Sequence, residues 1–81
     1  MTRVKTKQGE YRCAIEVLPR RVAHRDHYAA RVTWVVFVKA AHEQEEIPVG
    51  STPLREHWDE DQETARRKAV DEFTAWALAQ P

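Results

Sequence analysis

The stretch YAARVTWVVFV, residues 28–38, decides the fold of this chain. β-Branched and aromatic residues dominate it, as they do in strands with a half-buried surface. Because successive side chains of a strand point to opposite faces, the even-numbered positions from Tyr28 to Val38 share one face. We expect this face to carry the core, with Trp34 and Val36 at its centre.

The odd-numbered face of the same strand begins polar, at Arg31 and Thr33, and becomes apolar at Val35 and Phe37. A sheet with one helix leaves one face uncovered, and apolar side chains on such a face are common in symmetric dimers. We therefore predict a homodimer with Val35 and Phe37 in its interface. The alternative is that residues 47–58 fold back and bury both side chains within the monomer.

A second pattern predicts one amphipathic helix over residues 61–80. Its mostly apolar positions recur at helical spacing, and acids occupy its first turn, where they suit the positive end of the helix dipole. Asp59 or Asp61 can cap its start. We expect Phe73 and Trp76 to pack against Trp34 and Val36. The stripe comprises Ala65, Ala69, Val70, Phe73, Trp76, Ala77 and Gln80.

The remaining segments complete a β-β-β-α order. Residues 1–9 are polar and read as a flexible N-terminal arm. The pattern alternates from Glu10 and is expected to stop at Pro19, which lacks a backbone donor. Residues 47–50 could pair only briefly because of Pro48 and Gly50, and residues 54–58 could form a short third strand. We predict an α+β fold over residues 10–80: a two- or three-stranded antiparallel sheet with one C-terminal helix packed on one face.

Charge is distributed unevenly along a chain of zero net charge. Residues 1–42 contain nine Lys and Arg against three Asp and Glu, a charge of +6, and residues 43–81 contain four against ten, a charge of −6. If the fold separates the halves, the basic one can meet phosphate or an acidic partner. Otherwise the two halves attract each other, within a monomer or between protomers.

The densest basic segment is the predicted loop over residues 20–27, which we expect to be too long for a two-residue hairpin turn. It is a candidate contact for nucleic acid or an acidic partner, through phosphates or carboxylates. A continuous basic face would favour this interpretation, and intermixed charges would favour a protein-binding domain. The candidate residues are Arg20, Arg21, His24, Arg25 and His27.

No pattern in the sequence indicates catalysis or a cofactor. The one cysteine, Cys13, is expected on an apolar strand face as a buried, inert thiol. Ser51 follows the only glycine of its region, which is a turn signal rather than a phosphate loop. A zinc site from Cys13, His24, His27 and His57 is an open alternative, but ligand spacing is absent and we predict no metal.

The order of elements over roughly residues 11–77 resembles the small domain of HicB-type antitoxins, a partial ribonuclease-H-like sheet with one covering helix. It also resembles the last four elements of a double-stranded-RNA-binding domain, where a basic helix start grips phosphates, as residues 65–69 (ARRKA) would here. The acidic turn over residues 59–63 and the missing first helix depart from that family. The first resemblance implies a toxin partner, the second an RNA partner.

We therefore expect a small, non-catalytic, cytoplasmic binding or accessory domain that self-associates. A nucleic-acid-binding regulator acting through residues 20–27 is the alternative. The cytoplasmic assignment rests on the single cysteine, the lack of a signal-peptide pattern and the lack of an apolar run of about 18 residues, as a membrane span needs. Trp58 is either a core residue or an interface anchor.

Overall fold

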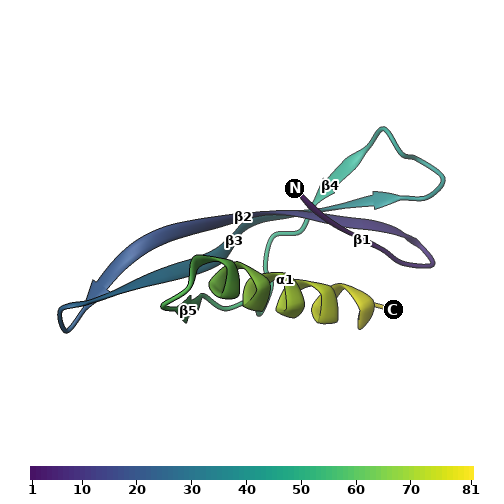
Figure 1. The fold of residues 1–81 in the computed structure, drawn as a ribbon. Coiled ribbons are helices and arrows are strands. Elements are labelled where there is room, and N and C mark those ends of the chain that lie inside the picture. Colours follow the sequence, from purple (N-terminus) through teal and green to yellow (C-terminus); the bar gives the residue numbers. More distant parts are fainter.

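The computed structural model describes residues 1–81 as one antiparallel sheet with a helix on one side (Figure 1). This confirms the α+β class, but the sheet has five strands rather than two or three. Its order is β1-β2-β3-β4. The fifth strand, β5, pairs directly with β3 at residues 28–30, whereas β4 pairs with β3 at residues 36–38. The elements are β1 (Thr2–Lys5), β2 (Gly9–Val22), β3 (Arg25–Lys39), β4 (Glu46–Pro48), β5 (His57–Asp59) and α1 (Gln62–Leu78).

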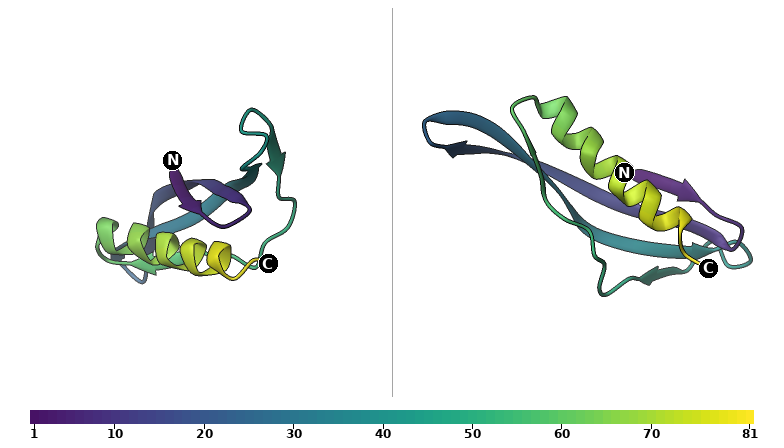
Figure 2. Two further views of the ribbon diagram at one scale, coloured as in Figure 1. Left: turned by 90° about the vertical axis from the view of Figure 1, so that its right-hand side faces the viewer. Right: turned by 90° about the horizontal axis from the view of Figure 1, so that it is seen from below.

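The long hairpin of β2 and β3 forms the frame of the molecule, and its far end projects beyond the helix (Figure 2). The strand does not stop at Pro19, which pairs with Tyr28. β2 has no neighbour on its other edge there, so that edge needs no donor. The turn is a two-residue one, Ala23 and His24 with φ of 50° and 65°, which corrects the predicted long loop. Two successive positive φ values suit the twist of a hairpin.

Residues 2–5 form strand β1 instead of part of a flexible arm. Val4 pairs with Tyr11 of β2, and both side chains pack against the core, so apolar contact holds the N-terminal segment on the sheet. The turn back into β2 requires glycine at position 9. A Cβ there would collide with the backbone carbonyl oxygen of Val38 on β3.

A β-bulge in the middle of the hairpin changes which residues of β3 face the helix. Ala14 pairs with Trp34 but Ile15 pairs with Val32, so Thr33 is an extra residue on β3. One inserted residue reverses the alternation of side chains beyond it. Even-numbered residues face the helix before the bulge, and odd-numbered residues face it afterwards.

The core therefore differs from the predicted one. Val35, only 5% exposed, packs with Cys13 and Phe73, whereas Trp34 is 44% exposed on the opposite side. Phe37 is half-buried on the helix side, with its ring centroid 4.7 Å from that of Tyr11. The prediction that Val35 and Phe37 lie on the face opposite the helix is wrong.

The fold-back alternative for residues 47–58 describes part of this arrangement. The backbone N–H of Val49 donates to the carbonyl of Val35 at 2.9 Å, and the side chains of Val49 and Leu54 pack on the core. The returning chain therefore helps to enclose Val35. The helix and the bulge account for the rest of its burial.

The helix matches its prediction closely. Asp61 caps it by accepting hydrogen bonds from the backbone N–H and hydroxyl of Thr64. Ala65 and Ala69 form a cluster with Ala30, and these small side chains let the first half of the helix approach β3 closely. Further along, Phe73 is fully buried, and the ring of Trp76 lies 6.2 Å from it.

Truncating Phe73 tests this core. Phe73→Ala should lower the free energy of unfolding by about 3–5 kcal/mol, because it removes the largest fully buried side chain. Leu78→Ala is the control, since Leu78 lies on the same helix with 62% of its surface exposed. It should change stability by less than about 0.5 kcal/mol in urea denaturation. Equal midpoints for the two variants would show that the helix docks differently.

Candidate functional site

One face of the sheet has no helix over it. Only the hairpin between β3 and β4 rises on that side, at one end (Figure 1). We call this side the uncovered face, and the alternation of side chains assigns residues to it. Its apolar members, from β2, β3 and β5, are Ala14, Leu18, Val22, Ala29, Trp34, Val36, Val38 and Trp58.

The register aligns part of this apolar surface in one row across three strands. Leu18 pairs with Ala29, which pairs with Trp58 on its other side. Ala29 is only 2% exposed, since its larger neighbours flank it, whereas Trp58 keeps 40% of its surface exposed. The indole N–H of Trp58 donates to a carboxylate oxygen of Glu56 at 2.6 Å, which fixes the ring in place.

Trp34 forms a second apolar point on the uncovered face. It pairs with the small Ala14 and is 44% exposed, the highest exposure of any aromatic residue in the chain. The row between the two tryptophans holds an ion pair, in which Arg31 and Glu16 approach to 3.3 Å. The centre of the uncovered face therefore contains two exposed indoles, with the ion pair of Glu16 and Arg31 between them.

Charges on the sheet are intermixed rather than uniformly basic. Arg12 pairs with Glu10 at 2.6 Å and with Glu46 at 3.3 Å. The hydrogen bond from Arg12 lowers the pKa of Glu10, and the same bond raises the pKa of Arg12. Arg12 and Arg31 already pair with carboxylates, which leaves less positive charge on the sheet for a phosphate chain.

The basic residues predicted as a loop lie on the projecting end of the hairpin, residues 20–27, here called the hairpin tip. Pairing assigns Arg20, Arg25 and His27 to the uncovered face and Arg21 to the other, so they do not form one cluster. Arg25 lies 3.6 Å from Glu60, and Arg21 lies 3.9 Å from Asp26.

His24 sits in the turn itself, and His27 is close to the apolar surface, with its ring 6.5 Å from that of Trp58. The uncovered face and the hairpin tip are therefore continuous. Of the tip's arginines, Arg20 has no carboxylate partner, because its guanidinium donates only to the carbonyl of Pro19.

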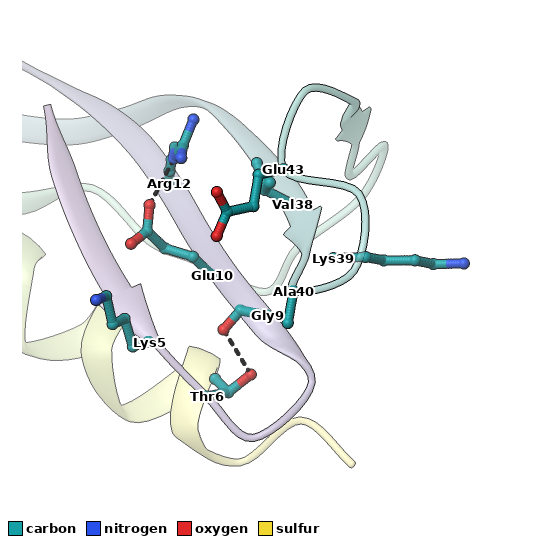
Figure 3. Close-up of a pocket in the computed structure, with 9 residues that line it drawn as sticks. All are labelled: Lys5, Thr6, Gly9, Glu10, Arg12, Val38, Lys39, Ala40 and Glu43. Carbon is teal, nitrogen blue, oxygen red and sulfur yellow. Dashed lines mark hydrogen bonds and ion pairs between the residues drawn. The ribbon is translucent and has the colours of Figure 1, made fainter.

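A hollow of about 310 Å³ lies at the opposite end of the sheet, between the β1–β2 turn and the β3–β4 hairpin (Figure 3). Lys5, Glu10, Arg12 and Glu43 are among its lining residues, and Figure 3 shows the ion pair of Glu10 with Arg12 on its wall. The lining contains no cysteine, histidine or serine. It offers a wall of mixed charge, in which the carboxylate of Glu10 is held ionised by Arg12.

The four residues of the zinc alternative are not brought together. Cys13 is buried in the core, where burial raises its pKa to about 11 and keeps it a thiol. His24 is at the hairpin tip, and His57 lies 3.0 Å from Glu72 of the helix. No group of three or more His, Cys, Asp and Glu side chains is placed to hold a metal ion.

The chain was compared with known proteins in three ways. A scan of protein-family models, a search of curated proteins and a search of solved structures return no match. The resemblances to HicB-type and double-stranded-RNA-binding domains stay predictions. The structure contains no helix of the length and apolar character that crossing a membrane requires.

Glu72 fastens the start of β5 and the residues before it, and hence Trp58, to the helix. Its carboxylate accepts hydrogen bonds from the backbone N–H of Arg55 at 2.8 Å and from the imidazole of His57 at 3.0 Å. Burial alone would raise the pKa of Glu72, but these two donors together outweigh it and leave the pKa lowered. The ionised form is therefore the one that the folded state favours.

This lowered pKa predicts a pH dependence. Glu72 stabilises the fold above its unfolded pKa of about 4.3, and the contribution disappears as pH falls through the lower folded value. Glu72→Gln should cost about 1 kcal/mol at pH 7, and the difference from wild type should shrink toward pH 3. Asp71→Asn, an exposed neighbour with no hydrogen bond, is the matched control for urea denaturation. A pH-independent difference would contradict this role of Glu72.

Proposed function

We propose that this chain is a small non-catalytic binding or accessory domain that acts in the cytoplasm and holds a macromolecular partner on the uncovered face. The observation that carries the proposal is the exposure of Trp34 and Trp58, at 44% and 40%, on the side of the sheet without a helix. Large aromatic side chains left in solvent cost hydration free energy, and tryptophan is enriched among residues that dominate interface energies.

The surroundings of the two indoles support this interpretation. Leu18 and Trp58 flank the nearly buried Ala29 in one row, so the apolar area extends beyond a single scattered side chain. Charged residues border it, as in protein interfaces with an apolar centre and a polar rim. The only thiol, Cys13, is buried and reduced, which fits a protein of the cytoplasm.

Site-specific photo-crosslinking in host cells tests the proposal. Benzoylphenylalanine placed at position 34 or 58 should yield covalent adducts on irradiation, because a bound partner would lie against these positions. Arg67, exposed on the helix and without an ion pair, is the control position and should yield few adducts. Equal yields from all three positions, or none from positions 34 and 58, would contradict the proposal.

Nucleic acid is a second candidate partner. The continuity of the hairpin tip with the uncovered face favours it, since Arg20 and His27 lie next to an exposed indole on which a base can stack. Against it, the arginines Arg12, Arg25 and Arg31 already pair with carboxylates. We therefore rank it below a protein partner.

Fluorescence titration of the tryptophans with a single-stranded oligonucleotide measures this candidate directly. If the tip binds phosphates, affinity should fall steeply with salt, and the variant with Arg20, Arg21 and Arg25 all changed to alanine should bind at least about tenfold more weakly. Replacing Arg66 and Arg67 on the helix provides a control of similar charge change. No binding by wild type at low salt would remove nucleic acid as a partner.

A further inference from the structure

We infer that the partner on the uncovered face is a second copy of this chain, packed sheet against sheet about a two-fold axis. This inference rests on the proposed function of that face and names its occupant. Three properties of the structure support it: the amount of exposed surface, the pairing of side chains across the sheet, and the distribution of charge.

The chain exposes more surface than a compact monomer of its size. Its accessible area is 5783 Å², whereas a folded monomer of 9.5 kDa should expose about 5,050 Å². Its radius of gyration is 14.2 Å, against about 12 Å for a compact domain of this length. The surplus of roughly 700 Å² comes with an elongated shape of 50 × 19 × 18 Å, in which the β2–β3 hairpin projects and the uncovered face stays open. A standard interface takes about 800 Å² from each partner.

The rows across β2 and β3 are self-complementary in size. Trp34 pairs with Ala14, and Leu18 pairs with Ala29, so each large side chain has a small cross-strand neighbour. A two-fold axis that lies in the interface and runs between β2 and β3, parallel to them, exchanges the two strands. It therefore sets the Trp34 of each copy over the Ala14 of the other, and each Leu18 over an Ala29.

The same axis matches the charged row between them. Glu16 and Arg31 are cross-strand neighbours, so the rotation places the Glu16 of one copy opposite the Arg31 of the other. Four alternating charges then meet at the centre of the interface, and none is left facing its like. A phosphate chain on this face would instead meet Glu16 at its centre.

The outer strands extend the match. One row of the uncovered face runs Lys5, Glu10, Val38 and Glu46 across β1 to β4. Because the axis exchanges β1 with β4, Lys5 of each copy meets the acidic β3–β4 hairpin of the other near Glu46. That hairpin rises on the uncovered side, toward the position of the second copy (Figure 1). The opposite charges of the two halves of the chain therefore attract between protomers.

Charge exchange across the central row tests the geometry. Glu16→Arg and Arg31→Glu change exposed side chains, so both variants should keep the wild-type circular dichroism spectrum. In a symmetric dimer of either variant, like charges face each other across the interface. Sedimentation should therefore show a dimer dissociation constant at least about tenfold higher than that of wild type. An equimolar mixture of the two should restore the dimer, because four opposite charges then face one another. Arg67→Glu, on the solvent side of the helix, should leave it unchanged.

Several results would overturn the inference. They are a wild type that stays monomeric at about 100 μM, single variants that dimerise as wild type does, or a mixture that fails to restore association. The proposed function is judged separately. Crosslinks from position 34 to a different macromolecule would refute the second copy but keep the uncovered face as a binding surface, whereas an absence of crosslinks would remove both.

Discussion

Thr33 stands opposite no residue of β2, and this one extra residue decides which side of the sheet each later side chain of β3 occupies. If Thr33 were paired in a regular ladder instead of bulged, Trp34 would face the helix and Val35 would face away from it. The bulge instead delivers Val35 to Phe73 and leaves an indole in solvent. Core and surface are thus set by the same local irregularity, and a bulge is a feature of backbone pairing that a single sequence does not reveal.

The parts that could be predicted are those with a strong local signal. The helix has a cap at Asp61 and an apolar stripe at helical spacing, and both lie where expected. β3 follows from its β-branched and aromatic residues. The register between β2 and β3 has no such signal, because Ala14 and Ile15 fit equally well opposite several partners. The face of Trp34 was therefore predicted incorrectly, whereas Trp58 was left open as an interface anchor and lies on the uncovered face.

Predictions that rested on one residue's usual preference were wrong where the surrounding structure changed the free-energy cost of that residue. Pro19 ends a strand only if its missing donor is needed, and β2 has a free edge at that point. Ala23 and His24 are not the glycine or asparagine that usually mark a two-residue turn, so the sequence concealed it. The polar N-terminus looked unstructured, yet Val4 alone supplies an apolar contact that holds β1 in the sheet.

The turn at Ala23 and His24 also has a consequence for the order of folding. Both residues occupy left-handed backbone conformations that are unfavourable for side chains with a Cβ, so the turn has little tendency to form by itself. When a hairpin forms from its turn outward, a turn of favourable conformation speeds its formation. Here we expect the transition state to contain the helix and the central part of β3, with the two strands pairing outward from the core and the turn closing last.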